Sequence, residues 1–195
     1  MSANRRDAPR REVIDNIAPP PRFQRNQCGV PAGTCTRSPG AQDDIELLVH
    51  NAGIGRFEML EGTTPSDVMA QFQVNALAPL LLTRALLPRL RSGAKVALVS
   101  SRMGSIGDNG SGGYYGYRMS KAALNAAGVS LAHDLKAEGI AVVILHPGAV
   151  RTGMTGGQGS IEPDTAASGL LQRIDELELG TTGRFLHADG TALPW

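Results

Sequence analysis

From Asp44 onward, short apolar segments alternate with helical segments, and most apolar segments end in a loop rich in glycine and small polar residues. The apolar segments cover residues 45–50, 95–101, 140–150 with its exit loop, and 183–190. The helical segments cover residues 63–93, 114–139 and 163–177. Strands that are apolar almost throughout and alternate with helices are typical of a parallel sheet covered on both faces. The sequence therefore predicts an α/β fold with a doubly wound parallel sheet.

Two positions in the helical segments define their expected shape. Pro79 should kink or split the helix over 63–93, because proline removes a backbone donor and clashes with the preceding turn. Gly139 should end the helix over 114–139, since glycine adopts the left-handed conformation that closes helices.

Residues 1–43 differ from the rest of the chain. They hold half of the prolines and both cysteines, and they show neither strand alternation nor helical periodicity. We expect two parts: an atypical segment over 1–43, either disordered or aberrant, and an α/β unit over 44–195. Cys28 and Cys35 have neither a second cysteine pair nor a nearby histidine, so we predict no metal site.

Composition limits the class of partner. Apolar residues make up 42% of the 195 residues, charged residues make up 19%, and the net charge is +1. This balance predicts a globular chain and argues against nucleic acid or an acidic membrane surface as partner. No apolar stretch approaches the ~20 residues that a bilayer requires. No secretory signal is visible, and we expect a cytoplasmic protein.

Ligands of open parallel sheets bind at the carboxyl ends of the strands. The informative loops are therefore 51–55, 100–113 and 146–155, which follow three successive predicted strands. All three are rich in glycine and small polar residues, as a binding crevice requires.

Tyr117 and Lys121 form a candidate acid–base pair. Residues four apart lie on one face of a helix, so the two side chains stack side by side. A nearby ammonium favours phenolate and lowers the pKa of tyrosine toward working pH. Ser101, at the end of the preceding strand, can hydrogen-bond the same substrate oxygen. In the alternative interpretation, Tyr117 only packs its ring and Lys121 only solvates a surface helix.

Four motifs occur in order along 44–195: "NAG" after one strand, "SS…GS" after the next, "YxxSK" opening a helix, and "HPGAVRT" after the third strand. This order resembles the short-chain dehydrogenase/reductases, whose fold is a Rossmann-like doubly wound sheet. The stretch "SRMGSIGDNGSGGYYGYRMSKAALN" and the ending "DGTALPW" are most similar to the C-factor and sniffer-type carbonyl reductases.

The resemblance implies catalytic roles for matching positions. Tyr117 would be the general acid/base, Lys121 would lower its pKa and hold the nicotinamide ribose, and Ser101 would orient the substrate carbonyl. Asn75 would support a proton-relay water, or it simply bonds locally at the Pro79 kink. Ser105 is an alternative to Ser101, because it lies nearer to Tyr117 in sequence.

The resemblance also implies NADP or NAD as cofactor. The loop formed by Asn51, Ala52 and Gly53 would run alongside the adenosine side of the cofactor. The positions that match the nicotinamide-contacting loop are Pro147, Gly148, Val150 and Thr152.

The glycine-rich turn that binds pyrophosphate in such folds has no counterpart in residues 1–43, so the first strands are expected to be missing or replaced and the sheet to be incomplete. A literal match, "TGMTGGQG" over 152–159, is interpreted as part of a mobile substrate loop, because no strand leads directly into it and no helix follows directly.

Three functions stay open. The first is an NAD(P)-dependent oxidoreductase that transfers hydride between nicotinamide and a small-molecule carbonyl or alcohol. The second is a non-enzymatic signalling or dimeric binding protein of C-factor type. The third is a truncated, inactive product. A homodimer through helices 65–91 and 114–138 is implied by the resemblance.

Overall fold

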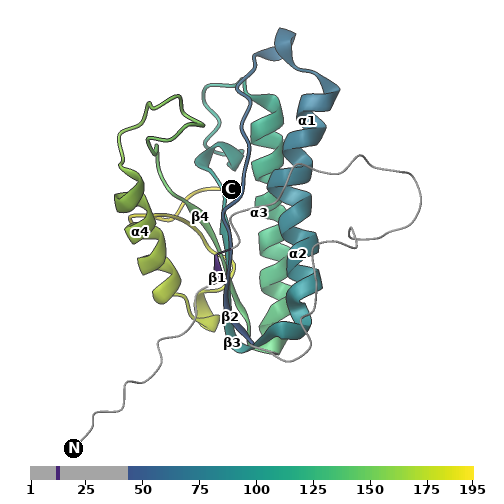
Figure 1. Cartoon of the computed structure of the whole chain (residues 1–195), viewed down its shortest axis with the longest axis vertical. Helices are drawn as coiled ribbons and strands as arrows, with labels where there is room; N and C mark the ends of the chain where they lie inside the picture. The colour runs from purple at the N-terminus through teal and green to yellow at the C-terminus, as the bar shows by residue number, and fades with distance from the viewer. Residues whose placement is uncertain (1–11, 14–43) are drawn as a thin grey trace, which may run out of the picture.

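The computed structural model describes residues 12–13 and 44–195, with the elements labelled as in Figure 1. The strands are β1 (Glu12–Val13), β2 (Ile45–His50), β3 (Leu90–Val99), β4 (Ala141–His146) and β5 (Phe185–His187). The α-helices are α1 (Pro65–Phe72), α2 (Ala78–Leu86), α3 (Tyr115–Leu135) and α4 (Pro163–Asp175). Short 3-10 turns occupy Leu60–Gly62, Leu87–Arg89, Arg102–Gly104, Lys136–Glu138 and Leu179–Thr181.

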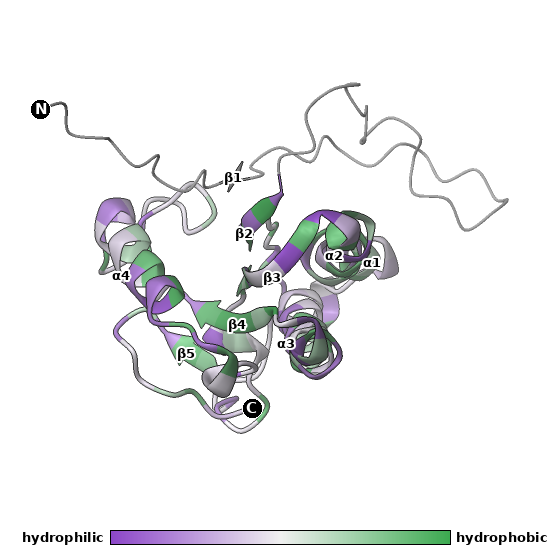
Figure 2. Ribbon diagram, turned by 90° about the horizontal axis from the view of Figure 1, so that it is seen from below, coloured by the Kyte–Doolittle hydropathy of each residue, from purple (hydrophilic) through white to green (hydrophobic). Residues whose placement is uncertain are grey.

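The five strands form one parallel sheet in the order β1-β2-β3-β4-β5. Helices α1, α2 and α3 cover one face, and α4 covers the other (Figures 1 and 2). Each face has its own apolar core: Leu98 and Leu124 belong to the core beneath α3, whereas Val143 and Ile174 belong to the core beneath α4. The predicted α/β class with a Rossmann-like parallel sheet is confirmed.

Helix α3 lies close against the sheet at Gly128. A Cβ atom there would lie 2.6 Å from Ile144 Cγ1 and 2.8 Å from Leu98 Cδ1, closer than van der Waals contact permits. The missing side chain therefore sets the distance between the sheet and the helix that carries the candidate site.

The helix predicted over 63–93 begins as expected. The Thr64 hydroxyl accepts a hydrogen bond from the Asp67 amide, and Pro65 is the first helical residue. Its predicted end is wrong. The helical segment ends at Arg89, and Leu90–Gly93 belongs to β3, where the register against β2 is irregular and Gly93 has a φ of 89°.

Pro79 acts through the turn before it. Gln73–Leu77 is a π-helical turn between α1 and α2, and the Ala78 amide bonds to the Gln73 carbonyl five residues earlier. The wider π-helical turn accommodates Pro79, which has no backbone N–H to donate to a helical hydrogen bond. It also places Asn75, fully buried, at the centre of the widened segment.

The edge of β2 that faces away from β3 pairs with β1. Glu12 is in register with Leu48, and Val13 is in register with Val49. These two residues of the 1–43 segment therefore satisfy donors and acceptors along the β2 edge, although no strand pattern is visible there in the sequence. The other calls on this segment, including those on Cys28, Cys35 and the glycine-rich turn, lie outside the described residues.

Candidate active site

The carboxyl ends of β2, β3 and β4 bring three loops together, over residues 51–64, 100–114 and 147–162. They meet at the upper end of the sheet in Figure 1, where α3 also begins. Because parallel strands end at the same edge, loops far apart in sequence form one crevice there.

Tyr117 and Lys121 lie in the first two turns of α3 and are both buried, at 8% and 4% exposure. The Lys121 ammonium lies 5.8 Å from the centroid of the Tyr117 ring and donates a hydrogen bond to the Val99 carbonyl at 2.9 Å. The surface-helix alternative is therefore wrong, because burial excludes a solvated Lys121.

Burial changes the pKa of both groups. It raises the pKa of the Tyr117 phenol above its usual value, and a side-chain hydrogen bond with Ser101 acts in the opposite direction. Desolvation lowers the pKa of Lys121 to about 8. The expected lowering of the Tyr117 pKa is thus wrong for this structure, because removing the ring from water outweighs its neighbours.

Ser101 and Ser105 occupy different environments. Ser101 is 7% exposed at the end of β3, interacts with Tyr117, and accepts a hydrogen bond from the Met103 amide. Ser105 is 2% exposed, and its hydroxyl accepts from the Asp108 amide within its own loop. The geometry brings Ser101, and not Ser105, against Tyr117.

Asn75 connects the loop after β2 to helix α3. Its amide nitrogen donates to the Ile54 carbonyl at 2.8 Å and to the Ser120 hydroxyl at 2.9 Å, while its oxygen accepts from the Ile54 amide at 2.8 Å. Ser120 in turn donates to the Tyr117 carbonyl at 2.8 Å. The bonding is therefore wider than a local contact at the Pro79 kink: it fixes the β2 loop relative to α3.

Gly53 lies where these side chains converge. A Cβ atom there would be 3.3 Å from Asn75 Oδ1 and 3.6 Å from Lys121 Nζ. Asn51 is exposed and Ala52 is half-buried beside it. The 51–53 loop therefore passes directly over the Lys121 ammonium with no side chain between them.

The loop after β4 holds the remaining predicted positions. Gly148, after Pro147, has a φ of 90°, and a Cβ there would lie 2.3 Å from Ile161 Cδ1, so both conformation and space require glycine. Val150 pairs with Ile161 in an isolated bridge. Thr152 is exposed, and its amide donates to the Thr155 hydroxyl.

The "TGMTGGQG" segment lies in this same loop, several residues after β4 ends and before α4 begins, and does not join the strand directly to the helix. Its residues form turns closed by bonds such as Gly157 amide to Thr152 carbonyl, and α4 begins only at Pro163. This arrangement is the one expected if the motif does not serve as a phosphate-binding turn.

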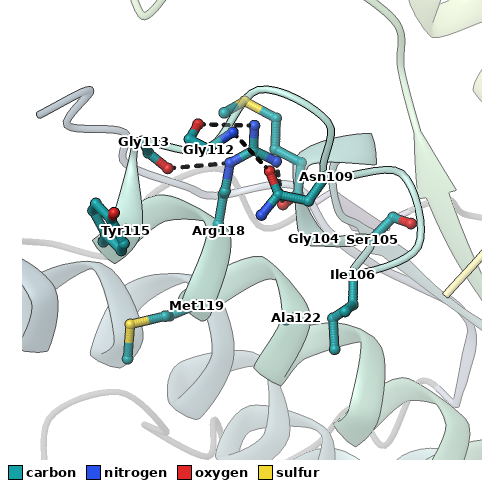
Figure 3. Close-up of a pocket in the computed structure, with 11 residues that line it drawn as sticks. Gly104, Ser105, Ile106, Asn109, Gly112, Gly113, Tyr115, Arg118, Met119 and Ala122 are labelled. Atoms are coloured by element: carbon teal, nitrogen blue, oxygen red, sulfur yellow. Dashed lines mark hydrogen bonds between the residues drawn. The ribbon is translucent and has the colours of Figure 1, made fainter. Parts of the chain in front are cut away.

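Arg118 organises the loop between Ser101 and Tyr117. Its guanidinium donates to the carbonyls of Gly113, Gly112 and Met103 and to the Ser111 hydroxyl, as Figure 3 shows in part. Beside it lies a cavity of about 290 Å³, lined by Ile106, Tyr115, Met119 and neighbours but not by Tyr117 or Lys121. We assign this cavity no part in the candidate site, because no acid–base group described above faces it.

The histidines have mainly structural environments. His50 Nε2 lies 2.8 Å from Thr83 Oγ1, and burial lowers the pKa of His50 to about 4. Burial likewise lowers the pKa of His146 to about 4, and its ring packs edge-on against His187 with centroids 5.2 Å apart.

Two contributors were missed from the sequence. Ser120 is fully buried between Asn75 and Tyr117, and its place inside the "YxxSK" pattern was the available signal. Phe57 packs edge-on against Tyr117 with ring centroids 5.4 Å apart. It lies in a loop without periodicity, so no sequence signal marked it.

Within residues 12–13 and 44–195, no group of three or more histidine, cysteine, aspartate or glutamate side chains is placed to hold a metal ion. Among the described helices, none combines the length and apolar character that a membrane crossing needs.

Known proteins share this sequence pattern. The family model for short chain dehydrogenase matches residues 37–162. A Rhodococcus sp. (strain AD45) protein named 1-hydroxy-2-glutathionyl-2-methyl-3-butene dehydrogenase is 43% identical over 155 residues, which cover 77% of this chain and 69% of that protein. The C-signal of Myxococcus xanthus is 45% identical over 154 residues, covering 77% of this chain and 93% of that protein.

Solved structures share the fold. Carbonyl reductase Sniffer of D. melanogaster superposes with a TM-score of 0.75 at 34% identity, covering 79% of this chain and 68% of that chain. An NADPH-bound carbonyl reductase from chicken fatty liver superposes with a TM-score of 0.74 at 33% identity, covering 78% and 67%. The resemblance inferred from the ordered motifs is confirmed, and the chain belongs to the short-chain dehydrogenase family.

Proposed function

We propose that this chain is an NAD(P)H-dependent carbonyl reductase in which Tyr117 is the general acid. The observation that carries the proposal is the buried constellation of Ser101, Tyr117 and Lys121 at the carboxyl end of the sheet. These residue types, held out of water around one point, suit proton transfer to a carbonyl oxygen.

Each residue has a separate task. The Tyr117 hydroxyl gives its proton to the substrate oxygen, and the Ser101 hydroxyl donates a hydrogen bond that orients the same oxygen. The Lys121 ammonium stabilises the phenolate that remains. Asn75 is a positioning residue, because it acts through Ser120 and the Ile54 backbone.

The raised pKa of Tyr117 bears on its resting protonation state. A phenol whose pKa lies above its usual value is protonated at neutral pH, so the resting enzyme is ready to donate. Alcohol oxidation would need the phenolate and would therefore be favoured only at alkaline pH.

The described residues fit the nicotinamide half of NADP or NAD. The Gly53 backbone lies close to the Lys121 ammonium, which would hold the ribose hydroxyls, while Pro147, Gly148, Val150 and Thr152 would line the ring. When bound, the dinucleotide supplies the hydride. Asn51 and Ala52 would lie beside the adenosine side. Within residues 44–195, no glycine-rich turn joins a strand directly to a helix in the way that a pyrophosphate site requires.

A second function has one specific observation in its favour. The C-signal of Myxococcus xanthus is matched over 93% of its length, so signalling or partner binding is the alternative to catalysis. A homodimer through helices 65–91 and 114–138 suits both functions. Exposed apolar side chains on these helices support it, namely Met69, Phe72, Leu80 and Met119.

The test is a fluorescence titration of the purified chain with NADPH and then NADH, followed by steady-state reduction of ketones. We expect saturable binding at micromolar concentration, and turnover that Tyr117→Phe abolishes while binding persists. A folded chain that binds neither dinucleotide would contradict the proposal and favour the signalling alternative.

A further inference from the structure

Two apolar side chains face one another above Tyr117, and they come from different loops. A Cβ atom built on Gly55 would lie 2.9 Å from Phe57 Cζ and 3.2 Å from Met154 Sδ. Phe57 belongs to the loop after β2, whereas Met154 belongs to the loop after β4. The ring tip of Phe57 and the thioether of Met154 therefore both lie against Gly55, although they come from different loops.

Phe57 also connects this contact to the candidate acid. Its ring lies edge-on to Tyr117 at 5.4 Å and to Tyr114 at 5.3 Å, with interplanar angles of 72° and 70°. Edge-on aromatic packing and sulfur–ring contacts both favour a further flat ring in the same space.

The described part of the chain leaves both side chains partly exposed. Phe57 is 42% exposed and Met154 is 40% exposed, and Ile54 and Met59 in the same loop are exposed as well. Apolar groups gathered at a crevice and left in contact with water provide a surface that an apolar ligand can bury.

The arginines around the crevice are all engaged. Arg56 pairs with Asp67 at 3.1 Å, Arg102 with Asp108, and Arg151 with Glu162. Arg118 donates to backbone carbonyls of its own loop. Of the arginines described in the three crevice loops and the first turn of α3, none is left to receive a substrate anion.

We propose that Phe57 and Met154 form an apolar clamp that makes this chain select uncharged carbonyl compounds bearing an aromatic ring. The inference rests on the proposed function and names its substrate class. The proposed substrate class differs from the one in the name of the Rhodococcus relative. That name includes a glutathionyl group, and a glutathionyl group carries carboxylates.

The test compares three ketones of similar size: acetophenone, cyclohexyl methyl ketone and 4-acetylbenzoate. In the wild type we expect kcat/KM for acetophenone to exceed that for the cyclohexyl ketone by about tenfold, and turnover of the carboxylate to be lower still. Phe57→Leu and Met154→Ala should each reduce the aromatic preference by about fivefold. Gly55→Ala should reduce it too, because the new methyl group pushes the clamp apart.

Leu171→Ala and Leu179→Ala are the controls, since both residues are exposed apolar side chains outside the clamp and outside the helices proposed for the dimer. They should leave the ratio unchanged. Equal turnover of the aromatic and cyclohexyl ketones, or a ratio that Phe57→Leu does not change, overturns the clamp. Efficient reduction of 4-acetylbenzoate overturns the charge argument.

A binding measurement separates this inference from the proposed function. Saturation-transfer NMR with acetophenone should show binding to the wild type and to Tyr117→Phe, and weaker binding to Phe57→Leu. If no ketone is reduced but this pattern holds, the clamp stands and the reductase proposal fails. If ketones are reduced but Phe57→Leu leaves acetophenone binding unchanged, the clamp is wrong and the reductase proposal stands.

Discussion

The β3–α3 side of the candidate site and the loop after β4 hold their side chains in different ways. Asn75, Ser101, Tyr117 and Lys121 are each at most 8% exposed, and their bonds join separate elements. In the 147–162 loop, Thr152 and Met154 are exposed, and the bonds join near neighbours such as Thr155 and Val150.

The buried side of the site suits the chemical step, whereas the loop after β4 suits substrate selection. Groups that transfer a proton need fixed geometry, which packing against α3 and the sheet supplies. A loop held by its own turns opens at a low free-energy cost, so it can admit and release a ligand. We therefore expect mutations on the buried side to act on kcat and mutations in the loop to act on KM.

The largest expected effect is that of Tyr117→Phe. Loss of the proton donor should reduce kcat by about 10³-fold, because general acid catalysis contributes that order of rate. The ring remains, so the free energy of unfolding should change by less than about 1 kcal/mol. Ketone reduction and urea denaturation measure the two quantities, and retained turnover would remove Tyr117 from the acid role.

The next largest effect is the pH dependence of reductase activity, which we attribute to Lys121. Its pKa is lowered to about 8, so the free enzyme should lose reductase activity as pH rises through that value and the ammonium is neutralised. Lys121→Met should abolish that pH step along with most of the activity.

The effect of Lys121 on stability has the opposite sign. A lowered lysine pKa means that the folded state binds fewer protons than the unfolded state between pH about 8 and the usual lysine pKa, so its contribution to stability rises with pH there. Denaturation of the wild type and Lys121→Met across this range should show that slope only in the wild type. An identical slope in both proteins would show that Lys121 is not the group responsible.

Asn75→Ala should affect structure and catalysis together. It removes three hydrogen bonds of a fully buried side chain, and we expect the free energy of unfolding to fall by about 3 kcal/mol. Ser120→Ala removes one link of the same network and should cost less. If Asn75→Ala were as stable as the wild type, the β2 loop would not depend on this network.

The smallest effect belongs to the loop. Thr155→Val removes the hydroxyl that accepts from the Thr152 amide and donates to the Val150 carbonyl, in an exposed turn. Stability should fall by less than about 1 kcal/mol, and any change should appear in KM. A fall in kcat comparable to that of Asn75→Ala would contradict the division between the two regions.

Local patterns predicted much of this fold. Apolar runs located β2 and β4, Thr64 and Pro65 located the start of α1, and Gly139, with a φ of 74°, closes the helical segment that begins with α3. The boundary at Leu90 was missed because Leu90–Ser92 continues a helix-compatible sequence up to Gly93, and only its pairing in the sheet decides its conformation.

The part of the candidate site that lies at the ends of strands was predictable from the order of the motifs. The Tyr117–Lys121 spacing and the position of Ser101 after β3 identified their meeting point. The raised pKa of Tyr117 depends on burial by the whole fold, and Phe57 reaches the site from an irregular loop. Neither property is encoded in local spacing, so neither could be read from the sequence.

The most direct test of the central claim is transfer of deuterium from stereospecifically labelled NADPH to acetophenone, followed by mass spectrometry of the alcohol. We predict that the wild type places deuterium on the carbinol carbon and that Tyr117→Phe, which still binds NADPH, yields about 10³-fold less labelled alcohol in the same time. Unlabelled product, or no product from a folded chain that binds NADPH, would contradict hydride transfer at this site.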